Sequence, residues 1–265
     1  MKPTVAVKTR LRRRAGAVVA GVVSATALAG LTLAATLGDN AAVRWALVTG
    51  PVLCAGFALL ATNLDANRAA GATVLRPRLG SANVVTIARG TLLAWLAGFA
   101  MVPWETGPLA AAPVALYLGN TALDAVDGAL ARRVGNVTEL GARLDAEFDG
   151  AGVLVGLGVA VAADILPDAL VLVGLIKYTY VGIGWLASRR GRPLSPLPAR
   201  ASRRPLAGLQ MFAVAVALSP LLVRPAATLV AGAVGTAYTL GFVRDLWLRL
   251  GRGAYERVDL VGQQS

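Results

Sequence analysis

The sequence predicts an all-helical protein that crosses a membrane several times, and three observations lead to this prediction. Hydrophobic residues make up 56% of the 265 residues, and only 15% are charged, against roughly 25% in a typical soluble domain. Mean hydropathy is +0.64. Apolar runs of about 20 residues, the length that crosses a hydrocarbon core of ~30 Å as a helix, recur along the whole chain between short polar breaks.

We expect eight spanning helices. The first two follow a basic N-terminus at 1–14 and occupy 15–61. A polar, amphipathic stretch at 62–81 then predicts a helix that lies on the membrane surface. The other six spans form a single domain at 82–249, followed by a polar tail at 250–265, and they are expected at about 83–103, 109–131, 141–163, 168–187, 205–223 and 226–248.

The distribution of basic residues predicts the orientation of these spans. The chain has 26 Lys and Arg against 14 Asp and Glu, a net charge of +12. The polar segments between the expected spans lie alternately on the two sides of the membrane. The segments on one side, together with both ends of the chain, hold nearly all the basic residues, whereas the segments on the other side hold only Arg44 and Arg224. Because basic segments stay in the cytoplasm, both termini are expected there, in the plasma membrane. We therefore expect the arginines to meet lipid headgroups and phosphorylated substrates, and no nucleic acid.

Two residue counts exclude several chemistries. The chain has no histidine, which excludes histidine-based triads and HExxH zinc sites. Its one cysteine, Cys54, lies in an apolar run and cannot form an intrachain disulfide or a cysteine-rich zinc site. Catalysis must therefore use carboxylates, Lys, Tyr, Ser or Thr, or a bound metal.

Aspartates gather at the facing ends of two expected spans. Asp124 and Asp127 are three residues apart, and Asp145 and Asp149 are four apart, so each pair projects from one face of a helix. The short connection between the spans makes them antiparallel neighbours. Carboxylates are rare inside membranes and mark functional sites. We therefore expect the four carboxylates to face one another near the cytoplasmic surface.

Four carboxylates at close range repel each other unless cations lie between them. Oxygen ligands without histidine or cysteine favour hard divalent ions, so Mg²⁺ or Mn²⁺ is the expected cofactor, and the charge of the group suggests two ions. Arg132, at the end of the first span, can contact a phosphate held at these metals.

The segment resembles the CDP-alcohol phosphatidyltransferase family. The family pattern is Asp-x2-Asp-Gly-x2-Ala-Arg-x8-Gly-x3-Asp-x3-Asp, and every fixed position matches at Asp124, Asp127, Gly128, Ala131, Arg132, Gly141, Asp145 and Asp149. A second family feature, Pro-Asn-x-Leu-Thr-x-x-Arg, is similar to the stretch 82–89, where Ala82 and Val85 replace the proline and the leucine. The resemblance covers about 82–249, six spans as in the family, with two extra helices in front.

The resemblance implies an enzyme that transfers a phosphatidyl group from a CDP-linked lipid to an alcohol and releases CMP. Asp124 and Asp145 would bridge the two metals, Asp127 would bind one, and Asp149 would bind the other and act as the base. The residues implied to hold the CDP-lipid are Asn83, Thr86, Gly128, Arg132 and Thr138. A homodimer is also implied by the family, although no feature of this sequence indicates one.

The acceptor and the donor's lipid are left open. Lys177, in the middle of an apolar run, and Arg203 and Arg204, at the start of a span, are candidates for binding the acceptor. The basic loop at 188–204 favours a phosphorylated polyol such as glycerol 3-phosphate or inositol phosphate. The donor can be diacyl or ether-linked. A divalent-cation transporter is the alternative function, and it would spread acidic residues through the membrane depth instead of at one edge.

Overall fold

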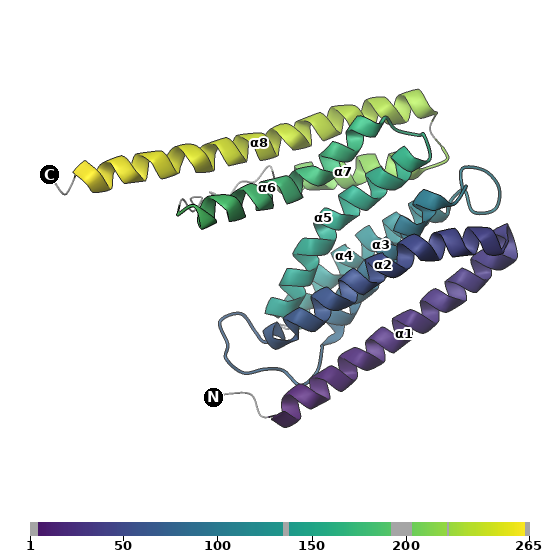
Figure 1. Ribbon diagram of the computed structural model, residues 1–265, viewed down its shortest axis with the longest axis horizontal. Helices are drawn as coiled ribbons and strands as arrows, with labels where there is room; N and C mark the ends of the chain where they lie inside the picture. The colour runs from purple at the N-terminus through teal and green to yellow at the C-terminus, as the bar shows by residue number, and fades with distance from the viewer. Residues whose placement is uncertain (1–4, 135–137, 192–202, 222, 263–265) are drawn as a thin grey trace.

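The computed structural model describes residues 5–134, 138–191, 203–221 and 223–262, which form helices joined by loops (Figure 1). Side chains are described over the same ranges except at 127–134, 203–204 and 250–262. The all-helical prediction is confirmed, because these ranges form eight α-helices: α1 (Val5–Leu37), α2 (Asp39–Asn63), α3 (Ser81–Gly98), α4 (Ala112–Val134), α5 (Glu139–Ala162), α6 (Val171–Arg189), α7 (Arg203–Leu218) and α8 (Arg224–Gly262).

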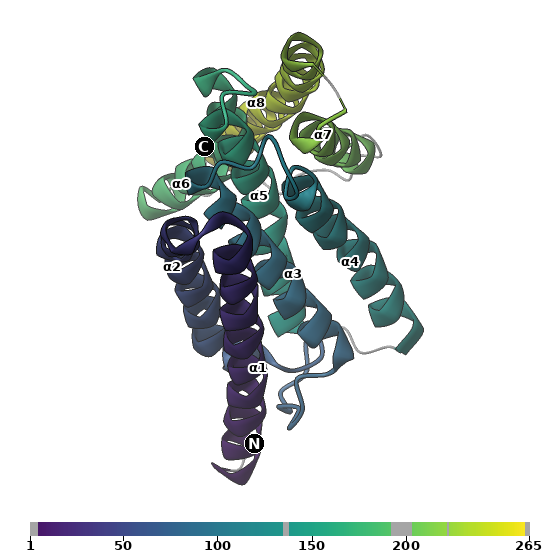
Figure 2. The ribbon, with the colours of Figure 1, turned by 90° about the vertical axis from the view of Figure 1, so that its right-hand side faces the viewer.

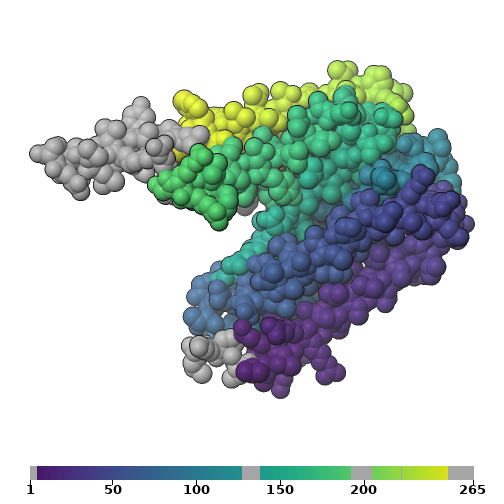
Figure 3. All heavy atoms as spheres, in the orientation of Figure 1, coloured from purple at the N-terminus to yellow at the C-terminus, as the bar shows by residue number. Residues whose placement is uncertain are grey.

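Helix α3 lies at the centre of the first half of the molecule, where it packs against α2, α4 and α5, and α1 runs along α2 on the outside (Figure 2). Helix α5 continues into the second half, where it packs against α6 and α7. Helix α8 packs against both α6 and α7. The two halves diverge, so that the surface between α2 and α6 is hollowed (Figure 3).

Within the described residues, five helices are long and apolar enough to cross a membrane, which is the composition of a multi-pass membrane protein. They are α1, α2, α3, α6 and α8. The other three described helices are more charged or shorter. Helices α4 and α5 carry the charged motif, and α7 has 16 residues. The ends of the chain are more helical than expected, since α1 begins at Val5 within the basic N-terminus and α8 continues to Gly262 through most of the expected tail.

The two N-terminal helices are attached to α3 by a pair of tryptophans. The indole N–H of Trp45 on α2 donates to the backbone carbonyl of Trp95 on α3 across 2.9 Å. The indole N–H of Trp95 donates in turn to the hydroxyl of Thr26 on α1 across 3.0 Å. Trp45 is buried and belongs to the main apolar core, so these contacts combine packing with satisfied polar groups. Helices α1 and α2 are therefore packed onto the rest of the bundle.

The surface helix expected at 62–81 does not form over most of that range. Helix α2 continues to Asn63, a 3-10 turn follows at Leu64–Ala66, and residues 67–80 are an irregular loop. Gly71 and Gly80 have φ angles of 72° and 78°, in the left-handed region that ends helices. The glycines explain why this polar, amphipathic stretch forms a loop and not a helix.

This loop is held in place by one buried asparagine. The side-chain amide of Asn67, which is fully buried, donates to the backbone carbonyls of Arg76 and Arg78 across 3.0 and 2.9 Å. These bonds satisfy backbone groups that a helix would have paired internally. Leu75 and Leu79 of the same loop are buried in an apolar cluster with residues of α1, α2, α3 and α5. The loop thus packs against the bundle.

The close packing of α5 with its neighbours depends on a glycine. A side chain at Gly156 would meet Tyr117 of α4, with its Cβ 3.0 Å from the ring, and would also collide with Val214 of α7. Tyr117 and Val214 are both buried. Gly156 therefore lets α4 and α7 approach the same turn of α5, two turns beyond Asp149.

Candidate active site

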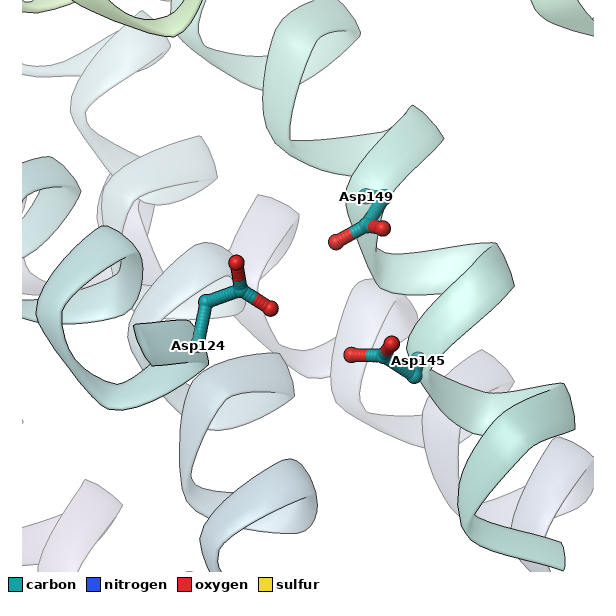
Figure 4. Close-up of side chains that lie close together, drawn as sticks. All are labelled: Asp124, Asp145 and Asp149. Atoms are coloured by element: carbon teal, nitrogen blue, oxygen red, sulfur yellow. The ribbon is translucent and has the colours of Figure 1, made fainter. Parts of the chain in front are cut away.

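Three of the four motif aspartates converge between α4 and α5. Asp124 extends from α4, and Asp145 and Asp149 extend from one face of α5, one turn apart (Figure 4). Each residue offers a carboxylate oxygen, and these oxygens lie within 4.8 Å of one another. The N-terminus of α5 is fixed by Thr138, whose hydroxyl accepts a hydrogen bond from the Gly141 N–H across 3.0 Å. The convergence that the spacing predicts is present in the fold.

The side chains of some predicted site residues are outside the description. Asp127, Gly128 and Arg132 belong to α4, but their side chains are not among those described. The side chains of Arg203 and Arg204, at the start of α7, are outside the description in the same way.

A buried arginine contacts all three converging carboxylates. Arg89, on α3, places its Nη1 atom 2.9 Å from Asp124 Oδ1 and also against Asp145 Oδ1. Its Nη2 donates to Asp149 Oδ1 across 2.8 Å. The Arg89 side chain is 0% exposed, whereas the three carboxylates are 37, 41 and 44% exposed. The cluster therefore has a buried side, held by Arg89, and an open side.

Three of the residues expected to contact the CDP group are buried and make hydrogen bonds within the protein. The hydroxyl of Thr138 donates to the side-chain oxygen of Asn83 across 2.9 Å, and the Asn83 amide donates to Asn67 across 3.0 Å. The Thr86 hydroxyl donates to the carbonyl of Ala82 across 3.1 Å. Asn83, Thr86 and Thr138 are 4% exposed or less. These contacts connect the loop at 67–80, the start of α3 and the start of α5.

An ion pair reinforces the same connection at the protein surface. Arg68 in the loop lies 3.0 Å from the carboxylate of Glu139 at the first turn of α5, and the Glu139 backbone N–H donates to the Arg68 carbonyl across 2.9 Å. The hydrogen bond from Arg68 holds the pKa of the Glu139 carboxyl below its ordinary value. The loop that precedes α3 is thereby joined to the helix that carries Asp145 and Asp149.

Lys177 lies beside the same helix. Its ammonium on α6 donates to the backbone carbonyl of Ala146, the residue that follows Asp145. Gly150, which follows Asp149, leaves the space that the Lys177 side chain occupies. The structure therefore brings Lys177 to the turn of α5 that bears the aspartates, although the two stretches are far apart in the sequence.

An apolar cavity borders α5 near the carboxylate cluster. It has a volume of about 300 Å³ and is lined by residues of α2, α3, α5 and α6. Two of its lining residues, Gly90 and Phe148, are the chain neighbours of Arg89 and Asp149. Helix α2 contributes Val52, Gly56 and Leu60 to the opposite wall. The cavity thus places a strongly apolar space within one residue of the charged cluster.

The three converging side chains fit a hard divalent cation. All of the donors are carboxylate oxygens, close enough together to coordinate one ion, and they are accessible from the open side. Carboxylates without histidine or cysteine are the ligand type of Mg²⁺ and Mn²⁺. The cluster can also bind phosphate groups through such ions, as nucleotide sites do.

Comparison with known proteins agrees with this geometry. The family model described as CDP-alcohol phosphatidyltransferase matches residues 79–241, more than half of the chain. A search among curated proteins found no match. The chain belongs to the CDP-alcohol phosphatidyltransferase family, whose enzymes transfer a phosphatidyl group from a CDP-linked lipid. The matched range begins just before α3 and ends within α8, so α1 and α2 lie outside it.

Arg89 is the site residue to which sequence reasoning assigned no role. It appears in the sequence as one charged residue within the otherwise apolar run of α3. A charge in such a run needs a partner of opposite sign, because an unpaired charge is costly to bury. The sequence therefore indicates that Arg89 needs an acidic partner, but the identity of the partners depends on how α3 packs against α4 and α5.

Proposed function

We propose that this protein transfers a phosphatidyl group from a CDP-linked lipid, CDP-diacylglycerol or its ether analogue, to a phosphorylated polyol such as glycerol 3-phosphate or inositol phosphate. CMP is released, and the product is a phospholipid. The observation that carries the proposal is the convergence of Asp124, Asp145 and Asp149 inside the family-matched range. Their grouping between neighbouring turns of α4 and α5 favours a single reaction site, unlike the distributed carboxylates of a transporter.

The metal ligands in this proposal are Asp124, Asp127, Asp145 and Asp149, which would hold two Mg²⁺ or Mn²⁺ ions. When bound, such ions draw negative charge from the pyrophosphate of the donor and so make its phosphorus easier to attack. Arg132 would contact the same phosphates through charge-assisted hydrogen bonds.

Asp149 is the proposed base. It takes the proton of the acceptor hydroxyl, and the oxygen then forms a bond to the phosphorus on the lipid side of the donor. The bond between that phosphorus and the bridging oxygen breaks, so CMP leaves with the electron pair. Because Arg89 contacts Oδ1 of Asp149 from the buried side, the carboxylate's open side is left for the acceptor.

The donor is proposed to bind with its head at the carboxylates and one acyl chain in the apolar cavity. Gly128 and Arg132 follow the first aspartates and would face the CDP group, together with Asn83, Thr86 and Thr138. The cavity beside Gly90 and Phe148 supports this arrangement, because it is apolar and adjoins the cluster. Burying an acyl chain there stabilises the complex by ~0.8 kcal/mol for each methylene group.

The acceptor site is proposed beside α6 and α7. Lys177 supports it, since its ammonium lies at Ala146, next to Asp145. Arg203 and Arg204 at the start of α7 would complete a basic site for the acceptor's phosphate. A phosphorylated acceptor would account for a lysine beside the turn that bears Asp145 and Asp149.

The reaction is proposed to face the cytoplasm in the plasma membrane, with eight spans and both termini inside. The bias of Lys and Arg toward alternate breaks supports this orientation. The contacts Lys8–Asp65 and Arg68–Glu139 bring the start of α1, the end of α2 and the start of α5 to the same end of the molecule. That end carries the motif.

Release of CMP by the purified protein tests the proposal. The protein is incubated in detergent micelles with CDP-diacylglycerol, Mg²⁺ and a panel of alcohols that includes glycerol 3-phosphate, inositol phosphate, inositol and serine. We expect CMP release with a phosphorylated polyol, and loss of activity after chelation with EDTA. Absence of CMP release with every acceptor contradicts the reaction, and activity only with an unphosphorylated alcohol contradicts the acceptor.

A further inference from the structure

Arg89 is a fully buried charge in the middle of an apolar helix. Its side chain is 0% exposed on α3, and burial of an unpaired guanidinium at such a place is strongly unfavourable. The described ion pairs give it three partners of opposite charge, Asp124, Asp145 and Asp149. The charge is therefore retained together with the carboxylate cluster.

The geometry of the guanidinium matches the arrangement of the carboxylates. Nη1 contacts Asp124 of α4 and Asp145 of α5, and Nη2 contacts Asp149 one turn further along α5. In each pair the contacting carboxylate atom is Oδ1. Two nitrogens in a fixed plane thus join side chains from two helices at defined positions, which a single ammonium group cannot do.

Arg89 contacts the cluster only from its buried side. The three carboxylates keep between 37 and 44% of their surface exposed on the other side. Without a cation near them, carboxylates whose oxygens lie within 4.8 Å would repel each other and turn apart. A fixed positive charge on the buried side holds them together and leaves the open side to divalent ions.

We propose that Arg89 is a positioning residue that holds Asp124, Asp145 and Asp149 in the arrangement that binds divalent cations. The inference rests on the proposed function, because it takes these aspartates as metal ligands. Arg89 acts through the carboxylates and does not touch the substrates. Outer partners of metal ligands typically change metal affinity by about 10- to 100-fold when they are replaced, and we expect an effect of that size here.

Binding of Mn²⁺ to the purified protein, measured by electron paramagnetic resonance without any substrate, tests the proposal. We compare Arg89→Lys, which keeps the positive charge but loses the planar fork, with Arg89→Gln, which loses both. The matched control is Arg143→Gln, since Arg143 is an exposed arginine on α5 whose described partner is Asn63. We expect about 10- to 100-fold weaker Mn²⁺ binding in both Arg89 variants and wild-type binding in the control.

Each result decides between clear alternatives. If the wild-type protein shows no saturable Mn²⁺ binding, the metal ligation in the proposed function fails. If the wild type binds Mn²⁺ and Arg89→Lys binds it equally well, only the positioning role of Arg89 is overturned. Mn²⁺ binding that is unchanged or tighter in Arg89→Gln also overturns the positioning role of Arg89. Circular dichroism and gel filtration report folding, and failure of both Arg89 variants to fold would show that Arg89 serves the fold and not the metal site.

Discussion

Gly150 on α5 lies against the side chain of Lys177 on α6, whose ammonium donates to the carbonyl of Ala146. A Cβ atom at Gly150 would lie 2.7 Å from Nζ and 3.0 Å from Cε of Lys177. Because the lysine side chain is flexible, a methyl group there moves the ammonium without breaking the helix. The position of this one cation can therefore be altered by a change on the neighbouring helix.

Gly150→Ala is expected to weaken binding of a phosphorylated acceptor. Loss of a charge-assisted hydrogen bond costs about 1.5–3 kcal/mol, so the KM for the acceptor should rise about tenfold or more while the KM for the CDP-lipid stays unchanged. Steady-state kinetics with each substrate varied in turn measure both values. Gly158→Ala is the control, since no atom lies within 4 Å of its Cβ position. Equal KM values for the acceptor in both variants would show that Lys177 does not bind the acceptor.

Asp149→Asn is expected to lower kcat by about 10²- to 10⁴-fold, because an amide cannot take the acceptor's proton. CMP release from the purified variant measures the loss. Asp168→Asn, an exposed change just beyond the far end of α5, is the control and should keep wild-type activity. An Asp149→Asn enzyme with wild-type kcat would assign the base to another group.

Gly56→Trp is expected to fill the apolar cavity and displace the acyl chain of the donor. No atom lies within 4 Å of a Cβ at Gly56, so the indole can enter the cavity without a clash at its base. Displacement of about two methylene groups, at ~0.8 kcal/mol each, raises the KM for the CDP-lipid about tenfold. Gly50→Trp, on the same helix and outside the cavity lining, should leave it unchanged. Equal values in the two variants would place the acyl chain elsewhere.

Asn67→Ala is expected to destabilise the junction between the loop at 67–80 and the bundle. The change removes the hydrogen-bond partner of two backbone carbonyls and of the Asn83 amide. Each buried polar group left without a partner lowers the free energy of unfolding by about 1–3 kcal/mol. We expect the Tm in detergent to fall by about 5–10 °C. Asn63→Ala, at the half-buried end of α2, should change the Tm much less. Similar Tm values for both variants would show that the Asn67 network adds little stability.

Glu139 gives the fold a pH-dependent contact. Arg68 lowers the pKa of the Glu139 carboxyl, so the ion pair stabilises the protein above the ordinary carboxyl pKa and is lost as the pH falls through the lowered pKa. Glu139→Gln should therefore unfold at a slightly lower temperature than the wild type above pH ~5, and the difference should disappear in acid. Thermal unfolding at several pH values measures this. A difference that persists below pH ~3 would show that the ion pair is not its cause.

The order and spacing of residues predicted the main parts of the site. Asp124, Asp145 and Asp149 could be placed together because helical periodicity sets each face and a short connection makes α4 and α5 neighbours. The prediction of a surface helix at 62–81 was wrong over 67–80, because the polar, amphipathic composition of this stretch also suits a loop, and Gly71 and Gly80 favour one. The packing of this loop through the Asn67 amide depends on tertiary contacts, which local sequence does not specify.

The sequence by itself determined that the protein lies in a membrane, that it is helical and which chemistry its motif supports. These properties depend on composition and on distances along one helix or between adjacent ones. The tertiary structure decided what surrounds the motif. Arg89 precedes Asp124 by 35 positions, yet it contacts all three carboxylates because α3 packs against both α4 and α5. Lys177 follows the motif in the sequence and α2 precedes it, and both reach its surroundings through the packing of their helices. Such contacts arise when helices pack against each other, and the spacing of residues within a single segment does not predict them.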